Sequence, residues 1–221
     1  MSSPMVAIAD YEMGNLFSVK QACEHVGLDT CITADPASID RASALILPGV
    51  GAFGDAMTCL KERELDTTIV AFAASGRPVL GICLGMQLLV TESFEFGWHA
   101  GLNLVPGKVI RFNPGPHNAG DFKVPQVQWN KLLYPPGLCG NLWTDTLLEG
   151  VSEGEFMYFV HSYYVVPEHA EDVLATTRYG DVEFCSVLRH GNIFAFQGHP
   201  ERSGRTGLRV YRNLANLLKQ S

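Results

Sequence analysis

Short apolar runs alternate with helical periodicities through the first part of the chain. Residues 16–26 keep apolar side chains at helical spacing and are followed by Gly27, so this segment predicts a helix. A second helix is predicted at 65–75, where Gly76 ends it. Apolar runs at 5–10, 30–33, 44–47 and 79–83 predict strands. Strands and helices that alternate in this way are typical of a parallel sheet covered by helices.

The second part of the chain is rich in glycine, proline and aromatic residues, and its predicted strands are short. They are expected at 107–112, 124–130, 155–160, 173–177 and 184–188, with a turn-rich loop at 113–120. Gly191-Asn192 indicates a hairpin turn, and an apolar stripe predicts a last helix at 206–219. We therefore expect one α/β domain over residues 1–221, with a central, mostly parallel sheet, flanking helices and an additional region of antiparallel strands.

Composition and charge narrow the classes of function. The chain has 221 residues, 47% of them hydrophobic, which suits a domain with a sizeable core. A net charge of −7 without a basic run argues against nucleic acid as the main partner. No apolar run reaches the roughly 18 residues of a membrane span and no secretory signal is recognisable, so a cytoplasmic protein is expected. None of the six cysteines forms a C-x-x-C pair, so we expect free thiols, no metal and no cofactor.

The strand predicted after Pro78 carries the first candidate for chemistry. It passes through Gly81-x-Cys83-x-Gly85 and changes to a helical pattern over 85–90, which is the shape of a nucleophile elbow. Glycines fit there because a Cβ beside so sharp a turn would crowd the backbone. Backbone N–H groups at the helix start would favour a thiolate and could hold an oxyanion. The alternative is that Cys83 is only a small buried hydrophobic residue, so a second element has to decide.

That second element is His199 with Glu201. Two residues apart in an extended chain, their side chains would lie on the same side, so that the carboxylate could orient the imidazole. Together with Cys83 they would form an activated-thiol triad, whose members need not be close in sequence. Taken alone, His199-Pro200-Glu201 is a weak signal that fits a histidine in a turn better than a catalytic base. His161, which ends another predicted strand, is a rival for the role of base.

A glycine-rich loop, Pro48-Gly49-Val50-Gly51-Ala52-Phe53-Gly54, follows the strand predicted at 44–47. It could be a simple turn, or a flexible loop that presents backbone N–H groups to a substrate. It is no phosphate loop, because it lacks the G-K-[ST] ending. If it is flexible, a partner and an acceptor ligand could switch it into a competent state.

The sequence Gly81-Ile82-Cys83-Leu84-Gly85-Met86-Gln87, together with His199-Pro200-Glu201, resembles the class I (triad) glutamine amidotransferases. The resemblance implies a flavodoxin-like or Rossmann-like single domain that hydrolyses glutamine at Cys83, with His199 as base and Glu201 as its orienting acid. The oxyanion hole would consist of the backbone N–H groups of Val50 and Leu84. The resemblance places substrate-binding residues at Gly49, Gly51, Gln87, His161, Ser162 and Tyr163.

Three further runs, at 10–15, 125–130 and 158–163, resemble the glutaminase subunits of imidazole glycerol phosphate synthase within that family. The resemblance implies a heterodimer with a (β/α)₈-barrel cyclase, to which ammonia passes through a channel in a step of histidine biosynthesis. Residues expected at the partner interface are Asn15, Pro125, Val127, Trp129, Asn130 and Arg202. The chain departs from the family at Gly198, where a bulky aromatic residue usually precedes the histidine, and this could loosen the wall behind His199.

The sequence also allows other interpretations. The chain could be the glutaminase subunit of another synthase, of the anthranilate, pyridoxal phosphate or formylglycinamidine type. It could be a cysteine peptidase of similar architecture, although such enzymes often place histidine directly after the cysteine, where this chain has Leu84. A non-catalytic structural subunit is a third class, against which the presence of all three triad residues argues.

Overall fold

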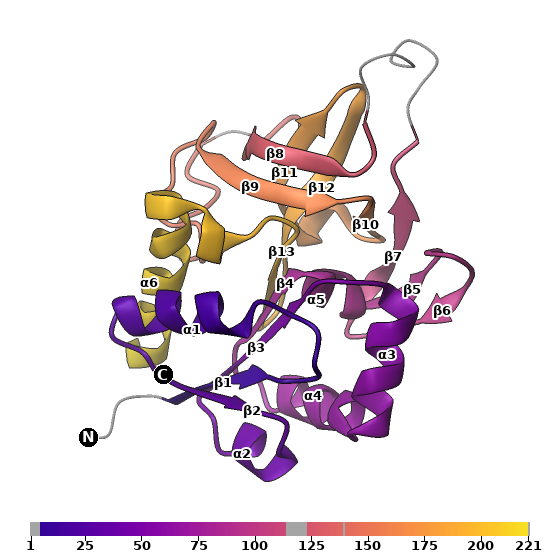
Figure 1. Ribbon diagram of the computed structural model, residues 1–221. Helices are drawn as coiled ribbons and strands as arrows, with labels where there is room; N and C mark the ends of the chain where they lie inside the picture. The colour runs from indigo at the N-terminus through magenta and orange to yellow at the C-terminus, as the bar shows by residue number, and fades with distance from the viewer. Residues whose placement is uncertain (1–4, 114–122, 139, 221) are drawn as a thin grey trace.

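The computed structural model describes residues 5–113, 123–138 and 140–220, and a seven-stranded sheet runs through its centre (Figure 1). Its strands are β1 (Met5–Ala9), β2 (Asp29–Thr33), β3 (Ala44–Gly49), β4 (Val79–Cys83), β11 (Val173–Tyr179), β12 (Val182–His190) and β13 (Ile193–Phe196). They lie in the order β11-β12-β13-β4-β3-β1-β2. From β13 to β2 all neighbours are parallel, whereas β11 and β13 each pair antiparallel with β12. The expected mostly parallel sheet is therefore present.

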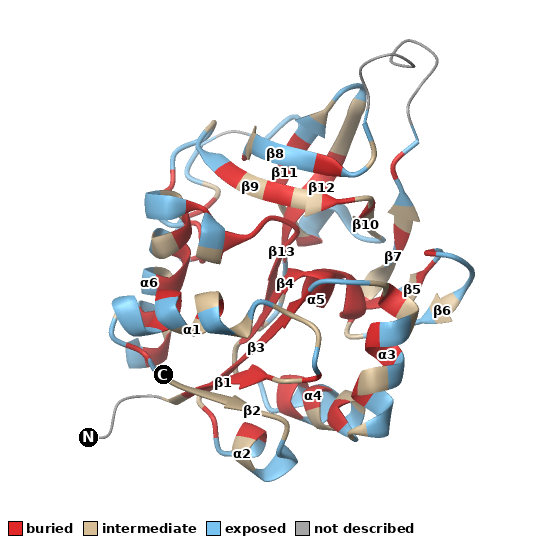
Figure 2. Cartoon of the chain, in the orientation of Figure 1, coloured by how far each residue is buried: buried red, intermediate tan, exposed pale blue. Residues whose placement is uncertain are grey.

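Helices cover both faces of this sheet. They are α1 (Leu16–His25), α2 (Pro36–Asp40), α3 (Phe53–Glu62), α4 (Leu65–Ala74), α5 (Leu84–Leu88) and α6 (Gly204–Gln220). Successive side chains of β1 point to opposite faces. Val6 and Ile8 pack in the core beneath α1 and α6, while Ala7 and Ala9 pack in the core beneath α3 and α4. Figure 2 shows the resulting arrangement, with buried strands between helices whose outer faces are exposed.

Two smaller sheets lie beyond the carboxyl end of the central strands. One contains β5 (Val90–Ser93), β6 (His99–Ala100), β7 (Val105–Arg111) and β10 (Tyr163–Pro167), and the other pairs β8 (Gln126–Lys131) with β9 (Phe156–His161). The expected region of antiparallel strands is present, because β7 with β10, β5 with β6 and β8 with β9 are antiparallel pairs, although β5 and β7 run parallel. β8 pairs with β9 alone in its sheet, as expected for an edge strand preceded by Pro125. The loop predicted at 113–120 lies, apart from Asn113, outside the described residues.

Some predicted boundaries are wrong for identifiable reasons. The helix after Cys83 was expected to extend to Val90, but it ends at Leu88 and Val90 instead pairs with Val105 in a strand. A β-branched residue that can join a ladder favours this outcome. The helices α2 and α3 were not predicted from the sequence. α3 begins inside the glycine-rich loop, although its buried residues Phe53, Ala56, Met57 and Leu60 follow helical spacing.

Candidate active site

Three segments that are distant in sequence meet at the carboxyl end of β4. Cys83 is the last residue of β4, and Gly49 lies opposite it on β3. On the other side Phe196, at the end of β13, pairs with Ile82. The glycine-rich loop therefore follows one neighbouring strand and His199 follows the other. Ligand sites of open α/β sheets are typically found at this edge, outside the carboxyl ends of the strands.

The backbone at Cys83 has the conformation of a nucleophile elbow. Its φ of 55° and ψ of −108° are costly for a residue with a side chain, and such strain concentrates at functional sites. Close packing explains the flanking glycines, as the sequence predicted. A Cβ on Gly85 would lie 1.7 Å from the carbonyl oxygen of Leu47, and one on Gly81 would lie 3.0 Å from the nitrogen of Met86. The turn therefore accepts only glycine at residue 85.

His199 and Glu201 form a buried pair, with 2.8 Å between His199 Nδ1 and Glu201 Oε1. The sequence predicted this contact from an extended chain, and that conformation is wrong. Residues Pro200–Arg202 form a 3-10 turn instead, and Pro200 starts it. The turn is tied down by Ser203, whose hydroxyl donates to the carbonyl of His199 at 2.6 Å and accepts from the Tyr158 amide at 3.0 Å.

The charge on His199 is set by its neighbours. Burial alone would lower the pKa of His199, but the negative charges of Cys83 and Glu201 outweigh it and raise this pKa to about 10. The other ring nitrogen, Nε2, is buried and makes no hydrogen bond of standard geometry with a described residue. With Nδ1 occupied by Glu201, Nε2 is the atom available to the sulfur. The arrangement favours a thiolate–imidazolium pair.

His161, the rival base, has a different environment. Its Nδ1 lies 2.8 Å from the carbonyl oxygen of Tyr163, so this nitrogen carries the proton and donates it. Burial lowers the pKa of His161 to about 4, because it outweighs the opposing effect of the Tyr163 carbonyl, and the nearby His199 adds a smaller lowering. His161 is therefore neutral near pH 7 and a weak base, which suits a wall of the site rather than proton transfer.

A cavity of about 270 Å³ opens beside Cys83. It is lined by Val50, Gly51, Cys83, Leu84, Gln87, Glu95, Pro125, Val160, His161, Ser162 and Tyr163. The fold thus brings together most of the predicted substrate-binding residues and both predicted oxyanion donors. Gly49 lies behind the wall instead, where a Cβ would be 2.1 Å from the hydroxyl of Tyr11 and 3.0 Å from Leu84 Cβ. That Tyr11 hydroxyl donates to the Pro48 carbonyl at 2.6 Å and so anchors the start of the loop.

Two residues of the site escaped the sequence reasoning. Glu95 is 8% exposed, and its carboxylate accepts a hydrogen bond from the Phe53 amide at 2.6 Å. Burial raises the pKa of Glu95, and the Phe53 amide opposes this rise. Gln197 is fully buried, with its amide nitrogen 3.8 Å from the sulfur of Cys83. No spacing in the sequence indicates that Glu95 or Gln197 belongs to the site. Their role becomes visible only in the folded chain.

Gln87 is buried rather than on the surface. Its amide nitrogen donates to the carbonyl of Tyr163 at 3.0 Å and to Oε1 of Gln197 at 3.1 Å. These two bonds connect α5 to β10 and to the segment that follows β13. Gln87 therefore holds the walls of the cavity together as well as lining it.

Most of the residues expected at a partner interface are exposed. Asn15, Val127, Trp129 and Arg202 are exposed, and Pro125 both is exposed and lines the cavity. Asn130 differs, because its side chain donates to the carbonyl of Arg178 at 2.8 Å within the chain. Tyr158 connects the surface to the triad. The Arg202 guanidinium lies 4.7 Å from the centre of the Tyr158 ring. The centres of the Trp129 and His199 rings lie 6.0 Å and 6.3 Å from the same point.

Gly198 does not leave a loose wall behind His199. A Cβ at this position would lie 2.8 Å from both Cγ and Sδ of Met157, which is fully buried. Met157 on β9 therefore fills the space that an aromatic side chain at residue 198 would need. The sequence suggested that Gly198 could loosen the wall behind His199, and this contact shows that the prediction is wrong.

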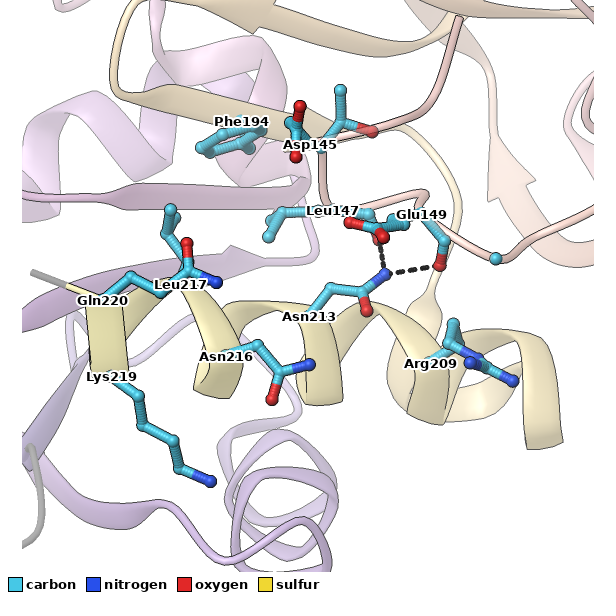
Figure 3. Close-up of a pocket in the computed structure, with 12 residues that line it drawn as sticks. Asp145, Leu147, Glu149, Phe194, Arg209, Asn213, Asn216, Leu217, Lys219 and Gln220 are labelled. Carbon is cyan, nitrogen blue, oxygen red and sulfur yellow. Dashed lines mark hydrogen bonds between the residues drawn. The ribbon is translucent and has the colours of Figure 1, made fainter. Parts of the chain in front are cut away.

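A larger cavity of about 620 Å³ lies elsewhere, between α6 and residues 145–150 (Figure 3). Asn213 crosses it and donates to the carbonyls of Leu147 and Glu149 at 3.0 and 2.8 Å. Arg209 and Lys219 line it together with Asp145 and Glu149, so its charges are mixed. None of the residues that line it is a cysteine or a histidine. The smaller cavity at Cys83 is therefore the candidate active site.

Comparison with known proteins identifies the family. Residues 7–216 match the family model described as "Glutamine amidotransferase class-I". The chain belongs to this family, and the fold and the Cys83 site agree with it.

Curated relatives narrow the family further. A protein of Syntrophotalea carbinolica is 46% identical over 215 residues, covering 96% of this chain and all of the relative. Relatives from Moorella thermoacetica and Geobacillus thermodenitrificans are 45% and 46% identical and cover 98% and 93% of this chain, and 96% and 92% of their own lengths. All three are named "Imidazole glycerol phosphate synthase subunit HisH". Within the class-I amidotransferases, the chain groups with these HisH subunits.

Solved structures agree on the fold. The structure of PurLQS from Thermotoga maritima matches with a TM-score of 0.73 and 22% identity, covering 98% of this chain and all of the other. A crystal structure described as that of a glutamine amidotransferase matches with a TM-score of 0.70 and 20% identity, covering 96% of this chain and 98% of the other. At these identities the likeness concerns the fold alone. Among the described residues, no helix combines the length and apolar character needed to cross a membrane.

Proposed function

We propose that this chain is the glutaminase subunit of an imidazole glycerol phosphate synthase, releasing ammonia from glutamine for a partner cyclase. The relatives named HisH, 42–46% identical over nearly the whole chain, support the choice of synthase. One structural observation carries the chemistry: Cys83 stands in a strained elbow beside His199, whose other side is held 2.8 Å from Glu201. That geometry suits acyl transfer through a thiolate.

The reaction follows from this geometry. The thiolate of Cys83 attacks the side-chain amide carbon of glutamine, and the backbone N–H groups of Val50 and Leu84 hold the oxyanion that develops. Losing one such donor costs roughly 10²–10³ in rate. The imidazolium of His199 gives its proton to the departing amine, so the C–N bond breaks and ammonia leaves. Water, activated by the now neutral His199, then hydrolyses the glutamyl thioester, and glutamate and the thiolate are released.

Glu95 is the group best suited to recognise the amino-acid end of glutamine. Its carboxylate lines the cavity, is held in place by the Phe53 amide and has an oxygen left for a cation. The α-ammonium of glutamine is such a cation, and a charge-assisted hydrogen bond to it would orient the substrate. Gln87, His161, Ser162 and Tyr163 line the same cavity and bound the substrate on the other sides.

Ammonia that escaped to solvent would be protonated, so an acceptor site must lie close by. The partner proposed is a (β/α)₈-barrel cyclase that forms a heterodimer with this chain in the cytoplasm. Trp129, Val127, Arg202 and Asn15 are exposed and are proposed to contact it. Trp129 and Arg202 both pack on Tyr158, which adjoins His199, so binding there can act on the triad.

The test compares two nitrogen sources in the reconstituted synthase. With the cyclase present, Cys83→Ala should abolish glutamine-dependent synthesis of imidazole glycerol phosphate and leave ammonia-dependent synthesis intact. Cys59→Ala, which alters a partly buried cysteine outside the site, is the matched control and should keep both. Glutamine-dependent synthesis that survives Cys83→Ala would overturn the proposal.

A further inference from the structure

The loop that carries Val50 is held at both ends by side chains from other parts of the chain. At its start, the hydroxyl of the buried Tyr11 donates to the carbonyl of Pro48 at 2.6 Å. At its end, the amide of Phe53 donates to Oε2 of Glu95, also at 2.6 Å. Residues 49–52 lie between these two anchors, and Val50 is exposed there. The position of the Val50 N–H group therefore depends on both hydrogen bonds.

Glu95 supplies the acceptor that the N-cap residue of α3 lacks. The helix begins at Phe53 after Ala52, and alanine has no side-chain acceptor for the N–H groups that a first helical turn leaves unpaired. The Glu95 carboxylate accepts from one of them, and the helix dipole favours a negative charge at this end of the helix. A charge-assisted bond of this kind is about twice as strong as a neutral one. Glu95 therefore fixes the point at which α3 begins and the loop ends.

The segment that contains Glu95 is itself held in place on the side away from α3. The amide of Glu95 donates to the hydroxyl of Ser93 at 3.2 Å. The amide of Phe94 donates to the carbonyl of Val109 on β7 at 3.0 Å. Because its backbone is tied to β5 and β7, Glu95 can act as a fixed support for the loop.

His99, the first residue of β6, supports the same helical turn by packing. A Cβ on Gly54 would lie 2.7 Å from Cε1 of His99, so the imidazole occupies the space beside the Gly54 backbone. The centre of the His99 ring also lies 6.2 Å from the centre of the Phe53 ring. The first turn of α3 is therefore held by a hydrogen bond from Glu95 and by the ring of His99.

We propose that Glu95 is a positioning residue of the oxyanion hole as well as the ligand of the substrate ammonium, with His99 as its support. Glu95 lines the same cavity as Val50 and Cys83. Its Oε2 holds the end of the loop, which leaves Oε1 for the ammonium of glutamine. An ammonium on Oε1 restricts the carboxylate, and a restricted carboxylate holds the loop more firmly, so substrate binding and the oxyanion hole are coupled. The inference rests on the proposed glutaminase function and adds the link between its two parts.

Two substitutions of Glu95 separate the anchor from the charge. Glu95→Gln removes the charge and keeps an acceptor for the Phe53 amide, whereas Glu95→Ala removes both. In the complex with the cyclase, KM for glutamine should rise in both variants, but kcat should be about tenfold lower in Glu95→Ala than in Glu95→Gln, because the oxyanion donor is misplaced. Glu62→Ala removes a carboxylate at the other end of α3 and should keep the wild-type kcat and KM.

Hydrogen exchange of residues 49–54 gives a readout that does not depend on turnover. In Glu95→Ala these amides should exchange about tenfold faster than in Glu95→Gln, because the Phe53 N–H group has lost its partner and the start of α3 opens more often. In His99→Ala the same amides should also exchange faster than in the wild type. The charge of Glu95 remains in that variant, so kcat should fall while KM rises less than in Glu95→Gln.

Equal kcat values in Glu95→Ala and Glu95→Gln, or equal exchange of residues 49–54 in the two variants, would overturn the inference. Thermal unfolding, recorded first, identifies a variant that does not fold. If Glu95→Ala is such a variant, His99→Ala decides, and exchange at the wild-type rate there would overturn the inference. The proposed function fails separately, when the wild-type chain releases no glutamate with its cyclase, and the exchange comparison can still be made in that case.

Discussion

The imidazole of His199 is held 2.8 Å from the carboxylate of Glu201 within a single 3-10 turn. Both residues belong to one short segment, and the turn that starts at Pro200 brings their side chains together. The contact fixes Nδ1 as the nitrogen that donates to the carboxylate. Nε2 is therefore left for the sulfur of Cys83, and the protonation state of His199 depends on that sulfur.

Removing the thiol should lower the pKa of His199. In the wild type this pKa is raised to about 10, and Cys83 contributes most to the rise. In Cys83→Ala only Glu201 opposes the lowering effect of burial, so the imidazole should lose its proton at a lower pH. Titration of the ring by ¹⁵N NMR measures this directly, with the exposed His25 as an internal reference. An unchanged midpoint would show that the sulfur carries no charge beside the ring.

His161 should make the protein sensitive to mild acid. Its folded pKa of about 4 lies below the ordinary 6.5, so the unfolded chain binds more protons between these values. The free energy of unfolding should therefore fall as pH falls from 6.5 to 4, by about 3 kcal/mol in total. Urea denaturation at several pH values tests this. In His161→Gln the loss over the same range should be smaller, and an equal loss would contradict the assignment.

Glu95→Gln should weaken glutamine binding. The substitution keeps an oxygen that can accept from the Phe53 amide but removes the charge offered to the substrate ammonium. We expect KM for glutamine to rise about ten- to a hundredfold, with a smaller change in kcat. Glu92 lies on β5, shortly before Glu95 in the sequence but outside the cavity, and Glu92→Gln serves as the control. If both variants keep the wild-type KM, the ammonium is bound elsewhere.

Substitutions at Gly198 and Met157 should have non-additive effects on the free energy of unfolding. Gly198→Phe alone forces a ring into the space of the Met157 side chain and should lower the free energy of unfolding by about 1–3 kcal/mol. Met157→Ala alone should cost about 2–5 kcal/mol, because it leaves a cavity in the core. The double variant should be more stable than the sum of both losses predicts. Strict additivity in chemical denaturation would show that the two positions do not share this space.

The sequence predicted the parts of the site that stand in motifs. Cys83 was identifiable because its two glycines and the change from strand to helix mark an elbow, and close packing at Gly85 explains that mark. The pairing of His199 with Glu201 was also predicted, but from an extended chain that the structure replaces by a turn. The two-residue spacing therefore predicted that the side chains meet, but it did not predict the backbone conformation that brings them together.

The remaining features depend on contacts that no spacing encodes. Glu95 enters the cavity because β5 joins a sheet with β7, a parallel pairing that the short run at 90–93 does not reveal. Gln197 meets Cys83 only because β13 and β4 are neighbours in the sheet. The helix α3 was missed because its first turn lies within a glycine-rich loop. Each case requires knowledge of which strands are adjacent or how a loop packs, and that is decided by the packing of the whole chain.

In the proposed reaction, Cys83 is the nucleophile that attacks glutamine. The most direct measurement treats the chain, bound to its cyclase, with a glutamine-shaped diazoketone that alkylates an active-site thiol, followed by peptide mapping of all six cysteines. We predict one label, on Cys83, that free glutamine prevents and that abolishes glutamate release. A label on another cysteine, or loss of activity without labelling of Cys83, would contradict the account.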